Sequence, residues 1–270
     1  MLGLTACMAS GDLVPETLAA QGHQDIARAE LIAPTTRYQH YVRGNEAEAG
    51  GLRAVMTDGR RLDLMLDESH VFEDRMPRLA DLDGDGRSEI VLVLTSLTEG
   101  ASLAVYGVAG DAVRLKAKTP SIGQPRRWLD PAGIADLTGD GRSEIAFVAM
   151  PHLVKQLQVW TYSGGALRQV ATVEDVANHR LGSPHTAMSA IADVDGDGIA
   201  DLIVPDGART TIRALSFAGG RAREIARYRL PAPADGDFAL AASGDGPVLS
   251  VPMESGTVAR IVLSPSTSGR

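Results

Sequence analysis

The feature that most constrains the fold is a nine-residue acidic segment that occurs three times. The copies start at Asp81, Asp136 and Asp193, so they are 55 and 57 residues apart. The first copy reads Asp-Leu-Asp-Gly-Asp-Gly-Arg-Ser-Glu, and every copy follows an alanine and precedes an apolar run. Self-similarity at such a period is typical of repeat architectures, in which each repeat is one supersecondary unit. The spacing therefore predicts a fold built from similar units.

The residues around each acidic segment predict an antiparallel sheet. Residues 90–94 form a continuous apolar run that is too short for a helix and is typical of a strand buried on both faces. Each unit contains four such candidate strands, which corresponds to one blade of a propeller. Full units are predicted at 77–117, 132–172 and 189–229, flanked by a partial unit at 31–66 and a degenerate one at 238–263. We therefore predict an all-β fold, a β-propeller of four-stranded blades with about five blades.

The ends of the chain give three further predictions. Residues 1–28 are predicted to be a lead-in, with a short helix outside the core, and residues 29–270 to form a single propeller domain. Residues 38–42 are a candidate strand. Because the degenerate unit lacks a fourth strand, residues 31–33 are predicted to supply it and close the ring.

The acidic segments have the composition of calcium loops. Calcium accepts six to eight oxygen ligands in flexible geometry, and so many uncompensated carboxylates would repel one another. Positions 1, 3, 5 and 9 are predicted to contribute side-chain oxygens, and position 7 a backbone carbonyl. The predicted ligands are Asp81, Asp83, Asp85, Arg87, Glu89, Asp136, Thr138, Asp140, Arg142, Glu144, Asp193, Asp195, Asp197, Ile199 and Asp201. Thr138 replaces a carboxylate, so we predict two to three ions with the weakest site in the second loop.

Other calcium loops fit less well. An EF-hand loop has an acidic residue at position 12 and leads into a helix, whereas position 12 here is Leu92, Phe147 or Val204 within an apolar strand. The alternative without a metal is a set of tight Asp/Gly hairpins.

Residues 80–93 resemble the FG-GAP (VCBS-type) repeat of integrin-α-like propellers, and the other two copies are similar to it as well. The resemblance covers about residues 77–263 and implies a propeller with calcium between the first and second strands of a blade.

Several basic and aromatic residues are predicted to gather on the face opposite the acidic loops. In a four-stranded blade, the loops between blades and between the second and third strands share that face. The candidate ligand-face residues are Arg126, Arg127, Trp128, His152, Asn178, His179, Arg180 and His185. They form either a site for a carbohydrate or protein partner or a set of solvated loop residues. Glu73 and Asp74 lie in a similar loop and are predicted to be solvated.

The composition argues against several functions. The net charge of −8 favours cation binding over nucleic acid, and no apolar stretch is long enough to span a membrane. The sequence contains no nucleophile elbow, zinc-binding HExxH motif or phosphate-binding glycine loop. Whether the protein is an enzyme stays open, but a non-enzymatic role is favoured.

The only cysteine is Cys7, which excludes an intramolecular disulfide. Its context, Leu4-Thr5-Ala6-Cys7, resembles the lipobox of bacterial lipoproteins, and the alternative is an unmodified thiol. We therefore predict an extracytoplasmic protein, periplasmic or on the cell surface, with a candidate lipid anchor at Cys7. Two functions remain: a non-enzymatic binding or scaffold module, and a polysaccharide-acting hydrolase or lyase, or a lectin, that uses the face opposite the acidic loops.

Overall fold

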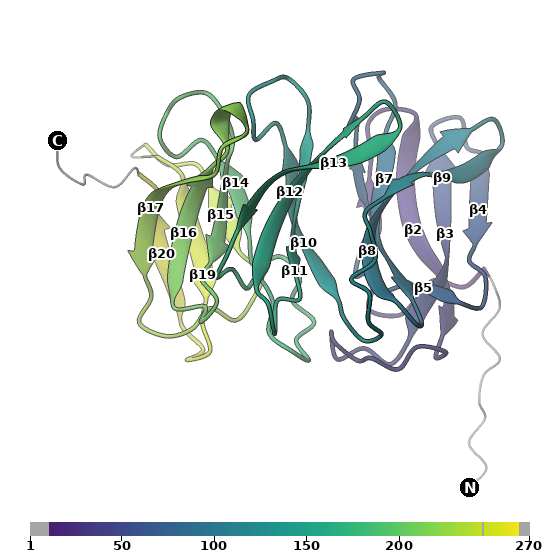
Figure 1. Ribbon diagram of the computed structural model, residues 1–270, viewed down its shortest axis with the longest axis horizontal. Helices are drawn as coiled ribbons and strands as arrows, with labels where there is room; N and C mark the ends of the chain where they lie inside the picture. Colours follow the sequence, from purple (N-terminus) through teal and green to yellow (C-terminus); the bar gives the residue numbers. More distant parts are fainter. Residues whose placement is uncertain (1–10, 245, 265–270) are drawn as a thin grey trace, which may run out of the picture. The chain divides into compact units, whose positions relative to one another are not determined.

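The computed structural model describes residues 11–244 and 246–264, and almost all regular structure in this part of the chain is β-strand (Figure 1). One 3-10 turn, η1 (Ala218–Gly220), is the exception among the described residues. The chain divides into two compact units. The first holds most of the chain before Trp128, and the second holds the chain from Trp128 onward together with Val42–Gly44 and Leu82–Gly84. The all-β prediction is confirmed.

The first unit contains one antiparallel sheet in the order β1-β2-β3-β5-β7-β8-β9, with β4 paired to β3 and β6 to β7. Its strands are β1 (Ala20–Gln21), β2 (Ile26–Thr35), β3 (Glu48–Met56), β4 (Arg61–Met65), β5 (His70–Phe72), β6 (Arg78–Ala80), β7 (Glu89–Ser96), β8 (Gly100–Ala109) and β9 (Ala112–Lys118). Strands β6 to β9 are the four predicted for the first full repeat. Every residue of β7 is buried, as expected for an apolar run covered on both faces.

The second unit contains three separate antiparallel sheets. Two have four strands and correspond to the second and third full repeats: β10 (Leu129–Ala135), β11 (Glu144–Ala149), β12 (Gln156–Ser163) and β13 (Ala166–Val173), then β14 (Ala190–Ala192), β15 (Asp201–Pro205), β16 (Thr211–Ser216) and β17 (Arg223–Arg229). The last sheet has the three strands β18 (Ala239–Ala241), β19 (Val248–Pro252) and β20 (Val258–Val262). The degenerate repeat thus lacks a fourth strand among the described residues, as predicted.

Apolar side chains on facing sheets hold the second unit together. Val148 of β11 and Leu202 of β15 belong to one buried cluster, and Ile212 of β16 and Leu249 of β19 belong to the next. Each of the two four-stranded sheets of the second unit therefore packs against the sheet that follows it, an arrangement that buries apolar side chains over a large area.

Three predictions for the N-terminal part are wrong. Residues 31–33 do not complete the last sheet, because β2 pairs with β1 and β3. Residues 38–42 form no strand. The described part of the lead-in contains β1 and the start of β2 in place of a helix, and Val14, Ala20 and Ile26 are core residues. Cys7 lies outside the described residues.

Candidate metal centres

The three acidic loops occupy equivalent places in the sheets. They connect β6 to β7, β10 to β11, and β14 to β15, so each joins the first and second strands of a repeat. The two glycines of every loop have φ angles between +77° and +86°, a conformation that other residues rarely adopt. This backbone folds each segment back on itself, and in the first and third loops three acidic side chains converge.

The third loop comes nearest to a complete cation site. One carboxylate oxygen from each of Asp193, Asp195 and Asp197 lies within 4.8 Å of the others. Asp193 accepts hydrogen bonds from the backbone N–H groups of Gly196 and Gly198, at 2.7 and 3.0 Å. These bonds orient the carboxylate, and the loop presents several anionic oxygens to one small volume.

Asp201 closes the same loop and is fully buried. Its Oδ2 accepts the backbone N–H of Val194 at 2.8 Å, whereas its Oδ1 is buried without a hydrogen-bond partner. The Oδ1 of Asp195 is likewise buried and unpaired, while its Oδ2 accepts Arg223 Nη2 at 2.9 Å. Burial, with Asp195 and Asp197 nearby, raises the pKa of Asp201 to about 6. Buried anionic oxygens without a partner are costly, and a bound cation would satisfy them.

The first loop also gathers its carboxylates. Oxygens of Asp81, Asp83 and Glu89 lie within 4.8 Å of one another. This loop has an additional support from the turn between β1 and β2, which the sequence did not indicate. Asp25 accepts the backbone N–H of Ser88 at 2.8 Å and forms an ion pair with Arg87 at 3.1 Å, and Gln24 Nε2 donates to Asp81 at 3.4 Å.

The second loop differs from the other two. Among the described residues, only the first and third loops bring three acidic groups within 4.8 Å, which agrees with the weaker site predicted from Thr138. Glu144 is almost completely buried, and its Oε2 accepts the N–H groups of Leu137 and Thr138, both at 3.0 Å. Burial and the nearby Asp140 raise the pKa of Glu144. A Cβ atom on Gly139 would lie 2.6 Å from Cδ1 of Ile199, so the third loop packs directly on the second.

The residues at position 7 (Arg87, Arg142 and Ile199) use their side chains in different ways. Arg87 pairs with Asp25, Arg142 donates to Ser163 Oγ at 2.9 Å, and Ile199 packs on Gly139. This variety is compatible with a ligand role for the backbone carbonyl, which stays a prediction, as does the ligand set as a whole.

Half of the predicted ligand-face residues are parts of a buried cluster in the second unit. Trp128 and His179 are 3% and 1% exposed, and Asn178 is fully buried. The Trp128 ring stacks on His152 and meets His179 edge to face, at centroid distances of 6.3 and 4.7 Å. Asn178 Nδ2 donates to the carbonyl of Asp130 at 3.3 Å. Trp128 is therefore a packing residue here, with little surface left for a ligand.

The hydrogen bonds of the two histidines define their tautomers. His179 Nε2 lies 3.0 Å from the carbonyl oxygen of Ser183, which only accepts, so this nitrogen carries the proton. His179 Nδ1 then accepts from Nε2–H of His152 at 2.9 Å. Burial, together with the adjacent His152, lowers the pKa of His179 to about 3. His179 is thus a neutral, structural histidine.

The remaining ligand-face residues are more accessible. Arg126 and Arg127 belong to the first unit, where the backbone N–H of Arg126 donates to Tyr38 Oη at 2.7 Å. In the second unit, Arg180 forms an ion pair with Asp235 at 2.8 Å, and His185 lies 3.4 Å from Asp237. Each of the latter two thus already has an acidic partner.

The prediction that Glu73 and Asp74 are solvated is wrong, because they are 0% and 2% exposed. Glu73 Oε1 lies 2.6 Å from His40 Nδ1, and its Oε2 accepts from Thr95 Oγ1 at 3.0 Å. Asp74 Oδ2 accepts from the backbone of Val93 and from Arg78, at 2.9 and 2.8 Å. Both carboxylates are satisfied within the first unit, and sequence adjacency alone gives no signal of this.

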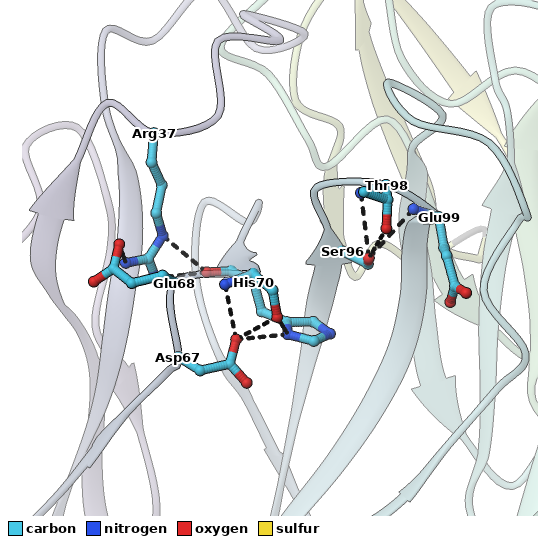
Figure 2. A network of polar contacts seen from close by, with 8 residues as sticks. Arg37, Asp67, Glu68, His70, Ser96, Thr98 and Glu99 are labelled. Carbon is cyan, nitrogen blue, oxygen red and sulfur yellow. Dashed lines mark hydrogen bonds and ion pairs between the residues drawn. The ribbon is translucent and has the colours of Figure 1, made fainter.

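A second polar network in the first unit was also missed (Figure 2). Asp67 Oδ1 lies 3.0 Å from His70 Nδ1, and Arg37 Nε donates to the carbonyl oxygen of His70 at 3.0 Å. Beside them, Ser96 Oγ accepts the backbone N–H groups of Thr98 and Glu99, at 3.3 and 3.2 Å. The Asp67 and Ser96 bonds are local bonds in turns, whereas Arg37 reaches His70 from 33 residues away, so the network stabilises the start of β5 and the end of β7.

The fold and the loops define a class: an all-β protein of repeated antiparallel sheets with an acidic loop after the first strand of each full repeat. The family model of the FG-GAP-like repeat matches residues 136–204, which contain the second and third loops. The resemblance to FG-GAP repeats is thereby confirmed for this segment. Among the described residues, no helix has the length and apolar character needed to cross a membrane.

Comparison with solved structures gives two rhamnogalacturonan lyases among the similar chains. The exotype rhamnogalacturonan lyase YesX is 14% identical, with a TM-score of 0.49 over 93% of this chain and 57% of that chain. The Bacillus licheniformis rhamnogalacturonan lyase PL11 is 16% identical, with a TM-score of 0.47 over 90% and 58%, respectively. The present chain thus spans somewhat more than half the length of these enzymes. No match was found among curated proteins.

Proposed function

We propose that the protein is a calcium-binding β-propeller that acts as a non-enzymatic binding or scaffold module. The observation that carries the calcium proposal is the third loop. The carboxylates of Asp193, Asp195 and Asp197 converge there, and the Oδ1 atoms of Asp195 and Asp201 are buried without a hydrogen-bond partner. Calcium is the common biological cation that best accepts so many oxygen ligands in an irregular loop. The first loop is the second site.

The propeller is supported by the repeats. Sheets β10–β13 and β14–β17 and strands β6–β9 share strand number, connectivity and loop position, and consecutive sheets of the second unit pack face to face. Units of this kind can close into a ring of about five blades. We place the protein outside the cytosol, where calcium is plentiful, and we include lipidation at Cys7 in the proposal.

Thermal melting with calcium or with a chelator tests the calcium proposal. A cation that binds only the folded state raises the melting temperature, because binding adds to the free energy of unfolding. We expect a higher melting temperature with calcium and calcium in elemental analysis of the purified protein. Identical melting curves, together with no calcium in the protein, would falsify the proposal. Glu174→Gln is a matched control, since it removes an exposed carboxylate of the second unit that lies outside the loops.

One observation favours the alternative of a polysaccharide-acting enzyme. The buried Glu73 carboxylate pairs with Nδ1 of His40. The His40 side chain is 14% exposed, and its Nε2 has no hydrogen-bond partner among the described residues. A carboxylate-oriented imidazole is a common form of general base. An enzyme would release unsaturated or reducing ends from acidic polysaccharides, and His40→Ala would abolish this activity. A scaffold would release none.

A further inference from the structure

Beside the second acidic loop lies a cavity of about 260 Å³. The loop contributes Thr138, Asp140 and Glu144 to its wall, β12 and β13 contribute Thr161 and Val170, and the η1 turn contributes Gly219 and Gly220. All of these residues belong to the second unit. A volume of this size far exceeds the space that a single bare ion occupies and is sufficient for a small organic molecule.

The cavity is held open by its glycine wall. The backbone N–H of Gly219 donates to the carbonyl of Thr138 at 2.9 Å, which ties the η1 turn to the acidic loop. Gly220 has a φ of +76°, and a Cβ there would lie 3.6 Å from Val170. A larger residue at this position would strain the turn and extend toward Val170, so glycine leaves this part of the cavity unfilled.

The charged groups that line the cavity are both acidic, Asp140 and Glu144. Glu144 is 1% exposed, and only its Oε2 is used by the backbone of Leu137 and Thr138. Asp140 uses Oδ1 for the N–H of Arg142 at 3.0 Å. None of the lining residues is basic, so two carboxylates face the cavity without a lining cation.

These features distinguish the cavity from the sites of the first and third loops. With threonine at position 138, the second loop forms no cluster of three acidic groups within 4.8 Å in the described part of the chain. The wall instead combines carboxylates and hydroxyls with the apolar surface of Val170. A cation with several N–H donors and an attached carbon skeleton satisfies both parts, since carboxylates form strong charge-assisted hydrogen bonds with ammonium groups.

We propose that this cavity binds a small organic ammonium compound. The ammonium group donates to Glu144 and Asp140, and the carbon skeleton lies against Val170 and the Gly219–Gly220 wall. This binding is separate from the calcium proposal for the first and third loops.

Calorimetric titration of the full chain, loaded with two equivalents of calcium, with glucosamine tests the proposal. Glucose is the control ligand, because it has a hydroxyl in place of the protonated amine on the same ring. We expect glucosamine to bind and glucose to bind at least about tenfold more weakly, since a hydrogen bond to a charged group contributes more than a neutral one. In amide NMR spectra, the signals of Thr138, Gly219 and Gly220 should shift with glucosamine.

Two variants probe the charge and the volume separately. Glu144→Gln can still accept the two backbone hydrogen bonds, and Val170→Phe fills the cavity without changing its charge. Each should weaken glucosamine binding by about tenfold or more, whereas Glu174→Gln should leave it unchanged. Equal binding of glucose, failure of glucosamine to bind, or full binding by both variants would overturn the proposal. Displacement of glucosamine by a third equivalent of calcium would also overturn it, and would leave the calcium proposal intact.

Discussion

At the scale of single residues, Asp201 is the group that best tests whether the third loop binds a cation. Its side chain is fully buried, and one oxygen has no hydrogen bond, so the anion is destabilised and its pKa rises to about 6. A nearby cation would reverse this effect, because it favours the charged form.

Replacing Asp201 with Asn should therefore have opposite effects with and without calcium. In chelator near pH 7, we expect the variant to melt at the same temperature as the wild type or higher, because a buried unpaired charge is removed while the amide oxygen can still accept from Val194. With calcium, its gain in melting temperature should be smaller than that of the wild type. Equal gains, with Glu174→Gln as the reference, would exclude Asp201 as a ligand.

His179 gives the protein a pH dependence of known sign. Its pKa is about 3 in the folded protein and about 6.5 in an unfolded chain. The unfolded state therefore binds more protons between these values, so the stabilising contribution is complete above about pH 6.5 and is lost as the pH falls toward 3. Below pH 6.5 the free energy of unfolding should fall by up to about 1.4 kcal/mol per pH unit from this group.

Urea denaturation at several pH values between 5 and 7 measures this dependence. His179→Gln should be less stable overall and should show a shallower slope over that range. His185→Gln is the control, because His185 is 43% exposed in its side chain. A slope in His179→Gln as steep as that of the wild type would mean that other groups cause the pH dependence.

At the scale of elements, the turn between β1 and β2 acts as a support for the first acidic loop. Asp25 accepts a hydrogen bond from the backbone N–H of Ser88 and forms an ion pair with Arg87, next to the predicted ligand Glu89. Asp25→Ala should leave the Ser88 N–H without its acceptor, at a cost of about 1–3 kcal/mol if it stays buried.

We expect Asp25→Ala to weaken calcium binding in the first loop and to leave the third loop unchanged. Amide hydrogen exchange reports on the two loops separately. We expect faster exchange in the variant at residues 87–89 only. Asp111→Asn, which removes an 88% exposed carboxylate that pairs with Arg60, is the control. Equal acceleration in both loops would contradict a local role for Asp25.

The repeated strands could be predicted from sequence because their signals are local. The apolar runs that became β7, β11 and β15 are short, continuous and preceded by a glycine-containing loop, so the loops set the register for all three repeats. Residues 31–33 were predicted as a strand and lie in β2, but β1 and the first half of β2 were missed because Arg28 and Glu30, which form an ion pair, interrupt the apolar pattern there. The burial of Glu73 depends on His40 and Thr95, which are distant in sequence. No local pattern indicates such contacts.

At the scale of the whole molecule, the loops predict how many ions the chain binds. Two clusters of three acidic groups converge among the described residues, and both lie in acidic loops. We expect two calcium ions per chain by calorimetry, and one ion after either Asp83→Asn or Asp195→Asn. At a calcium concentration about a hundredfold above the dissociation constant, each site would add about 2.7 kcal/mol to the free energy of unfolding. Three equivalent ions would show that the second loop also closes around calcium.

The contact between Gly139 and Ile199 has a consequence for related sequences. A Cβ at position 139 would lie 2.6 Å from the Ile199 side chain, so the isoleucine of one repeat occupies space that the glycine of the preceding repeat leaves empty. The two positions therefore cannot vary independently. Relatives with a larger residue at 139 should carry a smaller one at 199, and this pairing would appear as covariation between two positions, 60 residues apart, in neighbouring repeats.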